Sequence, residues 1–339
     1  MDISVFGSGA WGTAIALLLR DNGHNVTLWS KFSDEAEYLN RTRKNPLLSG
    51  IGIPEDISIS TDIKTAAHGA DAIIIAVPSY AVRETVETLY GQIGTGSAVI
   101  CMSKGIEKDT SCLFTGIIRE ILGENTPIAA VSGPTHAEEV ARRVPTACVA
   151  ASNDIVVAEQ VQSLLMNEYF RVYTSTDVIG VELGAALKNV IALSAGVCDG
   201  LGFGDNTLAM LMTRGLAEMA ELCVRMGGRK ETLAGLAGLG DLIVTCMSRH
   251  SRNRRAGVLI GKGISVHDAM KEVGAVVEGY YAAKAAHELS VAMGVEMPIC
   301  REAYSVLYEG KAPLAAINYL MSRSGRSEHD SGEETWVTI

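Results

Sequence analysis

The stretch DISVFGSGAWGTAIALLLRDNGHNVTLW at residues 2–29 decides the fold. It contains a short apolar strand, a glycine-rich turn, an amphipathic helix and a second strand, at residues 3–6, 7–12, 13–21 and 26–29. Gly7 permits a tight turn, Gly9 lets the backbone approach a pyrophosphate, and Gly12 lets the helix lie close to the strand. The helix N-terminus then presents free N–H groups to phosphates. This order predicts a dinucleotide-binding site, and a purely structural glycine turn is the alternative.

The end of the second strand bears on the choice between NAD and NADP. NAD-specific folds usually place Asp or Glu there to bind the ribose 2′-hydroxyl. Here the strand ends in Trp29-Ser30-Lys31, so a cation stands where the acid is expected. This lysine favours a 2′-phosphate, although it could also be an ordinary solvated residue, and the nearby Asp34 and Glu35 keep NAD possible. We therefore expect NADP or NAD as the cofactor, with NADPH favoured.

Strand and helix signals alternate up to about residue 176. The candidate strands lie at residues 57–60, 72–77, 98–101, 128–131, 146–151 and 169–173, and the candidate helices at residues 80–90, 112–122 and 155–167. Continuous apolar runs such as AIIIAV are typical of strands that are buried on both faces of a parallel sheet. We therefore predict an α/β fold for residues 1–176, with a Rossmann-like, doubly wound parallel sheet.

Polar segments follow three of these strands, at residues 77–79, 102–105 and 131–137. The carboxyl ends of parallel strands meet at one edge of the sheet, where ligands bind in such folds. Lys104 brings a cation to that edge, and the segment SGPTHA offers donors that can bind an anion. Each segment alone could be an ordinary loop, but their shared position indicates a binding crevice.

From about residue 177 the pattern becomes helical. We predict an all-helical domain at residues 177–321 and a disordered tail at residues 322–339. Two glycine-rich breaks interrupt the helices, at residues 199–206 and 235–241, and a basic cluster, SRNRR, follows at residues 251–255. Arginine is well suited to bidentate contact with phosphate, which favours a phosphate site, while a solvated basic face is the alternative.

One long predicted helix, ELGAALKNVIALSAG at residues 182–196, carries a single lysine, Lys188. Positions three and four residues away lie on the same helical face. Those positions are Gly184, Ala185, Ile191 and Ala192. Small residues beside a lysine have two interpretations: close packing of helices with the ammonium reaching out to water, or space cleared for a ligand towards which Lys188 points.

Composition limits the function further. The formal net charge is −10, from 29 basic and 39 acidic residues, so a broad nucleic-acid surface is not expected. The 7 cysteines form no C-x-x-C pair, which argues against a disulfide framework or a structural metal and favours a reducing cytoplasm. We expect no signal peptide, because the chain enters a strand at once, and no membrane span, because every long apolar run is interrupted by polar residues.

Taken together, the motifs resemble those of the bacterial-type NAD(P)-dependent glycerol-3-phosphate dehydrogenases. The matching segments are GSGAWGTA at 7–14, SKGIE at 103–107, SGPTHAEE at 132–139, ELGAALKNVIALSAG at 182–196, DGLGFGDN at 199–206, GLAGLGDL at 235–242, SRNRRAG at 251–257 and VVEGY at 276–280. They span nearly the whole chain except the tail. One departure is Ala10, where many members carry Ser, so one hydroxyl contact to the cofactor would be missing.

The resemblance implies the reversible reduction of dihydroxyacetone phosphate to sn-glycerol 3-phosphate with NAD(P)H, which supplies glycerophospholipid synthesis. It implies that Lys188 is the catalytic proton donor and acceptor. The substrate would be bound by Lys104, Gly133, Thr135, Lys188, Asp241, Ser251, Arg252 and Asn253. The cofactor would contact Gly7, Gly9 and Gly12 of the turn together with Trp11, Lys31, Lys104, Ala137, Arg252, Val276 and Glu278. A homodimer is expected, both by resemblance and because two-fold oligomers are common.

Two other functions remain open at this point. A β-hydroxyacid dehydrogenase also joins a dinucleotide domain to a helical domain with a catalytic lysine, but it would act on a carboxylate substrate, so a substrate panel separates the two. A non-catalytic NAD(P)H-binding redox sensor would need neither the lysine helix nor the SRNRR cluster. Tight cofactor binding without turnover of any ketone phosphate would favour that sensor.

Overall fold

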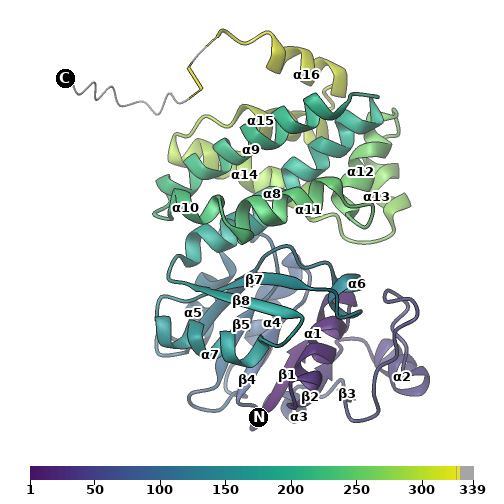
Figure 1. The fold of residues 1–339 in the computed structure, drawn as a ribbon, viewed down its shortest axis with the longest axis vertical. Helices are drawn as coiled ribbons and strands as arrows, with labels where there is room; N and C mark the ends of the chain where they lie inside the picture. The colour runs from purple at the N-terminus through teal and green to yellow at the C-terminus, as the bar shows by residue number, and fades with distance from the viewer. Residues whose placement is uncertain (326, 329–339) are drawn as a thin grey trace, which may run out of the picture.

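The computed structural model describes residues 1–325 and residues 327–328 of the chain. A sheet part, from β1 to β8, lies against a helical part, from α8 to α16 (Figure 1). The chain passes from one to the other between Ser175 and Val178. Most of the tail that was predicted at residues 322–339 lies outside the described residues.

Eight strands form one sheet in the order β3-β2-β1-β4-β5-β6-β7-β8. The strands are β1 (Asp2–Phe6), β2 (Asn25–Trp29), β3 (Ser58–Ser60), β4 (Ala72–Ile75), β5 (Ala98–Cys101), β6 (Ile128–Ser132), β7 (Thr146–Ala151) and β8 (Phe170–Ser175). The chain winds outward from β1 in both directions, which is the arrangement of a doubly wound sheet. The Rossmann-like fold class predicted from the sequence is confirmed.

The sheet departs from the prediction at its far side. Strands β3 to β6 all run parallel, but β7 is antiparallel to β6 and parallel to β8. A parallel return needs a long crossover, usually a helix. The link at residues 133–145 contains only the four-residue helix α6 (Ala137–Val140), so the chain turns back beside β6. The predicted parallel sheet therefore holds for β1 to β6, whereas β7 and β8 run antiparallel to those six strands.

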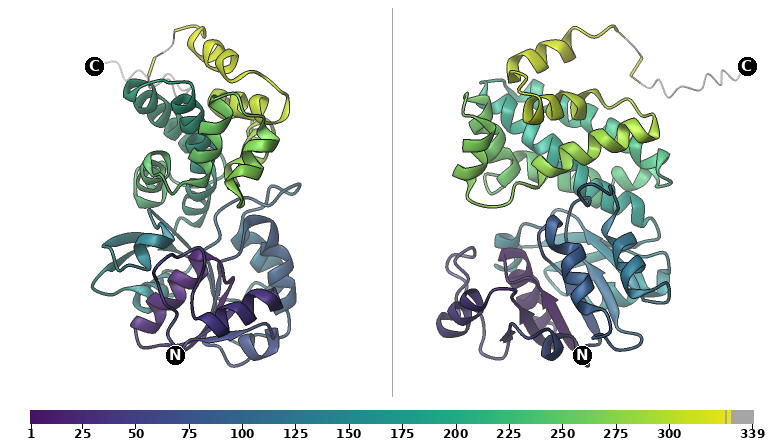
Figure 2. Two further views of the ribbon diagram at one scale, coloured as in Figure 1. Left: turned by 90° about the vertical axis from the view of Figure 1, so that its right-hand side faces the viewer. Right: turned by 180° about the vertical axis from the view of Figure 1, so that it is seen from behind.

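Helices cover both faces of the sheet (Figures 1 and 2). They are α1 (Ala10–Asp21), α2 (Ser33–Thr42), α3 (Ile63–Ala67), η1 (Ser79–Ala81), α4 (Val82–Leu89), α5 (Phe114–Leu122), α6 and α7 (Ile155–Leu165). In β4 the side chains alternate between two cores: Ile74 packs with α1 and α7, whereas Ile73 and Ile75 pack with α4 and α5. This explains the continuous apolar sequence of the strand.

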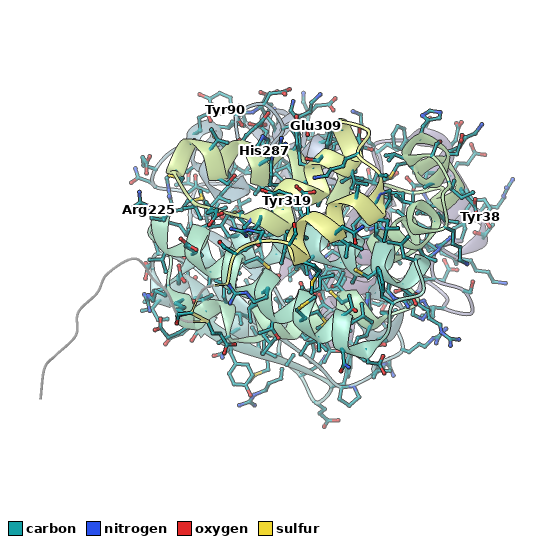
Figure 3. The ribbon with its side chains drawn as sticks, turned by 90° about the horizontal axis from the view of Figure 1, so that it is seen from above. Tyr38, Tyr90, Arg225, His287, Glu309 and Tyr319 are labelled. Atoms are coloured by element: carbon teal, nitrogen blue, oxygen red, sulfur yellow. The ribbon has the colours of Figure 1, made fainter. Side chains whose placement is uncertain are left out.

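The helical part is built around α8 (Val178–Gly200), most of whose residues are buried. The other helices are α9 (Asp205–Arg225), α10 (Lys230–Leu233), η2 (Leu236–Gly240), α11 (Asp241–Met247), α12 (Arg252–Gly261), α13 (Val266–Val273), α14 (Glu278–Met293), α15 (Pro298–Tyr308) and α16 (Pro313–Met321). The outermost, α16, lies across the side facing away from the sheet, where Figure 3 labels Tyr319.

Within the described residues, α8 alone is long and apolar enough to span a membrane by composition, and 83% of its most apolar window is buried inside the protein. Its neighbours approach closely at glycines. An added Cβ at Gly196 would lie 2.1 Å from the carbonyl oxygen of Arg254, and one at Gly257 would lie 2.0 Å from that of Leu193. The backbones of α8 and α12 are therefore in direct contact.

This packing bears on the two interpretations of the small residues near Lys188. At Gly184, an added Cβ would lie 2.6 Å from the carbonyl oxygen of Ala237. Gly184 therefore allows close packing of backbones, as the first interpretation expects, whereas the interpretation that the small residues clear space for a ligand stays a prediction. The expectation that the lysine reaches out to water is wrong, because the Lys188 side chain is only 7% exposed.

Candidate active site

Lys188 points into the protein from the middle of α8. Its Nζ donates hydrogen bonds to Oδ1 of Asp241, at 2.6 Å, and to Oγ1 of Thr245, at 2.8 Å. The carboxylate is as deeply buried as the ammonium, with 2% of the Asp241 side chain exposed. A buried lysine therefore has a fixed position and a fixed partner.

A glycine-rich turn delivers Asp241 to this position. Residues Leu236–Gly240 (η2) form one turn of π-helix, a local geometry that is frequent at functional sites. The turn is tight, because an added Cβ at Gly238 would lie 2.1 Å from the carbonyl oxygen of Leu233. Asp241 then begins α11, and Thr245 lies one turn later on the same face.

A second lysine reaches the same carboxylate from the sheet part. Lys104, in the segment after β5, donates to Oδ2 of Asp241 at 2.8 Å. Its Nζ also donates to the carbonyl oxygen of Gly133, at 2.9 Å, and to Oγ1 of Thr135, at 3.2 Å, in the segment after β6. One carboxylate thus joins lysines from both parts of the molecule, and five predicted site residues meet at one point.

The buried charges change one another's protonation. Burial lowers the pKa of Lys188 to about 8; Asp241 opposes this effect, and Lys104 adds to it. Burial alone would raise the pKa of Asp241, but the two lysines outweigh it, so the net direction is down and the group remains a carboxylate. The site therefore keeps one more positive than negative charge while Lys188 has an ammonium that can release its proton near neutral pH.

The SRNRR cluster forms the beginning of α12. Ser251 caps the helix by accepting a hydrogen bond from the N–H of Arg254, at 3.2 Å. Asn253 donates to Oδ1 of Asn189, the residue after Lys188, and accepts from the N–H of Gly279, both at 2.8 Å. Asn253 thus ties α12 to α8 and α14, next to the lysine.

Arg252 stands at the first position of α12 with its side chain exposed. Its charge acts on Glu278 at the start of α14: burial raises the pKa of Glu278, and the hydrogen bond from Ser79 and then the charge of Arg252 oppose that rise. Glu278 in turn accepts a hydrogen bond from the N–H of Ser79, which follows β4, at 3.1 Å. Arg252 is therefore a cation close to the boundary between the sheet part and the helical part.

The glycine-rich turn after β1 has the shape that a dinucleotide requires. Gly7 has a φ of +120°, and an added Cβ would lie 2.6 Å from the carbonyl oxygen of Ala76. At Gly12 an added Cβ would lie 1.7 Å from the carbonyl oxygen of Gly7, so only glycine lets α1 pack here. At Gly9, by contrast, nothing lies within 4 Å of the added Cβ, so there is open space into which a phosphate would fit.

Two further observations at this turn fit an anionic cofactor. Gly9 is the N-cap of α1 and gives the helix no side-chain cap, so the first N–H groups of the helix stay available. The indole N–H of Trp11 is buried without a hydrogen-bond partner. Buried polar atoms are normally paired, so an unpaired one beside a helix N-terminus is consistent with a ligand that supplies the acceptor.

Comparison with known proteins then decides the family. The family described as NAD-dependent glycerol-3-phosphate dehydrogenase matches in two parts, its N-terminus over residues 2–158 and its C-terminus over residues 177–318. The chain belongs to the NAD-dependent glycerol-3-phosphate dehydrogenase family. The family resemblance predicted from the sequence motifs is confirmed.

Individual relatives agree with this family assignment. A protein of Thermoanaerobacter sp. (strain X514), named as an NAD(P)+ glycerol-3-phosphate dehydrogenase, is 51% identical over 97% of this chain and 99% of its own. One of Fusobacterium nucleatum with the same name is 49% identical over 97% of this chain and 99% of its own. The crystal structure of glycerol-3-phosphate dehydrogenase from Coxiella burnetii superposes with a TM-score of 0.92 at 37% identity, covering 95% of this chain and 99% of that one.

The remaining predicted cofactor residues of this glycerol-3-phosphate dehydrogenase family member lie in three separate segments of the chain. Ala137 begins α6, which packs against α1. Val276 lines a cavity of about 490 Å³ together with Val277 and Tyr280. Lys31 follows β2, where its ammonium pairs with Glu84. Their roles as cofactor ligands stay predictions.

Sequence patterns missed three polar groups of the site. Thr245 could have been found, because it lies four residues after Asp241 and so on the same helical face. Ser79 belongs to no motif that would mark it as a site residue, and only its position after a strand suggests that it lies at the site. His136 lies within the SGPTHA segment; its Nε2 is buried without a partner, and its ring centroid is 6.3 Å from that of His250. Burial, together with Lys188 and Lys104, lowers the pKa of His136, so its imidazole is neutral at pH 7.

The part of the chain that the structure describes contains no group of three or more His, Cys, Asp and Glu side chains placed to bind a metal ion. The side-chain groups that meet at the site of this family member are instead two lysines, one carboxylate and two threonine hydroxyls. That set suits proton transfer and the binding of anions.

Proposed function

We propose that this protein catalyses the reversible NAD(P)H-dependent reduction of dihydroxyacetone phosphate to sn-glycerol 3-phosphate, and that it thereby supplies glycerophospholipid synthesis. The observation that carries the proposal is the buried contact of Lys188, Asp241 and Lys104 at the carboxyl edge of the sheet. The proposed reaction needs a proton donor and cations at that edge, and the ammonium groups of Lys188 and Lys104 can serve in these roles.

We propose that Lys188 is the proton donor in reduction and the proton acceptor in oxidation. The bound nicotinamide cofactor supplies or accepts the hydride. As the carbonyl oxygen gains negative charge, the Lys188 ammonium stabilises it and then transfers a proton to it. Asp241 holds the ammonium in place by accepting its 2.6 Å hydrogen bond, and it remains a deprotonated carboxylate because its pKa is lowered. Thr245 fixes the same nitrogen from a second direction.

The phosphate of the substrate needs fixed cations and N–H donors. We propose that Arg252 is the main phosphate ligand, because it is an exposed arginine at a helix N-terminus next to the lysine helix. The proposed substrate ligands are Lys104, Gly133, Thr135, Lys188, Asp241, Ser251, Arg252 and Asn253. The Ser251 side chain caps α12, and the Asn253 side chain bonds α12 to α8. Both side chains thereby position Arg252.

We propose that the cofactor lies along the turn after β1, with its pyrophosphate above Gly9. The open space at Gly9 and the uncapped N-terminus of α1 support this placement. The proposed cofactor ligands are Gly7, Gly9, Trp11, Gly12, Lys31, Lys104, Ala137, Arg252, Val276 and Glu278. On this assignment, residues 1–176 bind the dinucleotide and residues 177–321 bind the substrate. Lys31 favours NADPH over NADH.

An absorbance assay at 340 nm tests the proposed function. Purified protein is mixed with dihydroxyacetone phosphate and either NADH or NADPH, with a carboxylate ketone as the parallel substrate. We expect cofactor oxidation with the ketone phosphate and none with the carboxylate. Turnover of the carboxylate alone would favour a β-hydroxyacid dehydrogenase, and cofactor binding without any turnover would favour a redox sensor.

We also propose a homodimer in the cytoplasm. The dimer rests on the family resemblance and on the general frequency of two-fold oligomers. The location is supported by the seven free cysteines, six of them wholly or largely buried thiols without a disulfide partner, as expected in a reducing compartment. Light scattering should give twice the mass of one chain, and cell fractionation should recover the protein without detergent.

A further inference from the structure

The ammonium of Lys31 forms an ion pair with a carboxylate of the protein itself. Its Nζ donates to both carboxylate oxygens of Glu84, at 2.6 Å and 2.7 Å. Lys31 lies just after β2, and Glu84 lies in the first turn of α4, 53 residues later in the chain. This pair involves the very cation that favours NADPH.

The strand order shows what the pair crosses. β1 lies between β2 and β4 in the sheet, and β1 ends in the glycine-rich turn. Lys31 extends from the segment after β2, whereas Glu84 belongs to the helix after β4. The ion pair therefore spans the end of β1, on the side where the ribose 2′ position of a dinucleotide lies in this kind of fold.

Among the described residues, the ion pair of Glu84 is with Lys31, and the neighbouring arginine pairs with other carboxylates. Arg83, its neighbour in α4, is bound to Glu107 and Glu120. Glu35, in the first turn of α2, accepts a hydrogen bond from Oγ of Ser30 at 2.9 Å. The carboxylate that pairs with the Lys31 ammonium is therefore that of Glu84.

We propose that Glu84 sets the preference between NADPH and NADH by competing with the cofactor's 2′-phosphate for Lys31. This inference rests on the proposed function, because it requires the dinucleotide to bind at the turn after β1. NADPH must take Lys31 from Glu84, whereas NADH places only a neutral hydroxyl there. The carboxylate therefore weakens the binding of NADPH and leaves that of NADH nearly unchanged.

The pair is of a kind that a ligand can exchange. The side chains of Lys31 and Glu84 are 49% and 61% exposed, and exposed ion pairs contribute little to stability. Removing the Glu84 charge should therefore leave the fold intact. Removing this charge should tighten NADPH binding about fivefold, because the 2′-phosphate then no longer has to displace Glu84 from an exposed ion pair with Lys31.

Binding titrations that follow the fluorescence of NADPH and NADH test the proposal without relying on turnover. The proteins are the wild type, Glu84→Gln, Lys31→Ala, the double variant, and Glu87→Gln as a control. Glu87 is exposed on the same helix, one turn from Arg83, so its substitution changes the net charge equally. Thermal unfolding of each variant checks that the fold is kept.

We expect Glu84→Gln to raise the ratio of NADPH to NADH affinity about fivefold, Glu87→Gln to leave it within twofold, and Lys31→Ala to abolish the gain in the double variant. An unchanged ratio in Glu84→Gln would overturn the inference while leaving the proposed function intact. A gain that persists without Lys31 would also overturn it, because Glu84 would then act by direct repulsion. Failure of the wild type to bind either cofactor would instead overturn the proposed function, and this inference with it.

Discussion

The Nζ of Lys188 and the carboxylate of Asp241 lie 2.6 Å apart, and the second oxygen of the same carboxylate holds Lys104 at 2.8 Å. Two ammonium groups therefore share one buried counter-charge. An uncompensated buried charge is costly, and a site with one surplus positive charge favours an anion. The protein carries a net charge of −10, so this local excess is opposite in sign to the charge of the whole chain.

Replacing Lys188 with methionine should remove most turnover while cofactor binding stays nearly intact. Loss of a general acid typically costs 10²- to 10⁴-fold in rate. The measurement is kcat in the 340 nm assay, with the dissociation constant of NADPH as the control. Retention of more than about a tenth of the wild-type kcat would be too much activity for a lost general acid.

The pH dependence should differ between the two directions. Lys188, whose pKa is lowered to about 8, must be protonated for reduction and neutral for oxidation. Reduction should therefore be fastest below that pH and fall as the pH rises through it, whereas oxidation should rise over the same interval. Profiles of kcat against pH in both directions measure this, and identical optima would count against Lys188 as the proton-transfer group.

Asp241→Asn should shift the oxidation profile to lower pH. The amide keeps the shape of the side chain but removes the negative charge that favours the Lys188 ammonium. Since the buried Lys188 and the partly buried Lys104 then lack a counter-charge, the variant should also lose about 3 to 5 kcal/mol of stability. Denaturant unfolding gives the loss of stability. A profile with unchanged midpoint would show that Asp241 does not control the protonation of Lys188.

Arg252→Ala should raise the KM for dihydroxyacetone phosphate by about 10- to 100-fold, which is the usual effect of losing a charge-assisted hydrogen bond. Arg255→Ala is the matched control, because Arg255 is exposed on the same helix. Steady-state kinetics on both variants give the comparison. Equal effects, or a change in thermal stability alone, would remove Arg252 from the phosphate site.

Gly257→Ala should destabilise the protein by about 1 to 3 kcal/mol, as overpacking does, because its methyl group would meet the carbonyl oxygen of Leu193. Gly116→Ala in α5 is the control: an added Cβ there meets nothing within 4 Å. That variant should be as stable as the wild type or more so, since alanine is the better helix former. Thermal or denaturant unfolding of the two variants tests the difference in sign.

Local patterns predicted most of the fold. The turn from Gly7 to Gly12 could be predicted from the spacing of its glycines. The strands could be predicted because burial on both faces gives a continuous run of apolar residues. The reversed direction of β7 could not be predicted, because an apolar run has the same sequence pattern in a parallel strand as in an antiparallel one. The short helices α2 and α3 were missed because their sequences are polar or too brief to show a period.

The site was predictable only in part, for a related reason. Motifs identified Lys188, Asp241 and Lys104 individually, but their joint contact brings together residues 53 and 137 positions apart. The pairing of Lys31 with Glu84 is likewise a property of the folded sheet order. Contacts between distant residues depend on topology, which spacing within a motif does not encode.

The crossing of α8 and α12 has a consequence for substrate choice. Gly196 and Gly200 of one helix and Gly257 and Gly261 of the other each face a carbonyl oxygen, so no side chain separates the two backbones. One helix carries the proposed proton donor and the other the proposed phosphate ligand. If the proposed roles hold, this contact fixes the distance between the two groups, and we expect the enzyme to prefer a ketone whose phosphate lies at that distance from its carbonyl over shorter or longer homologues.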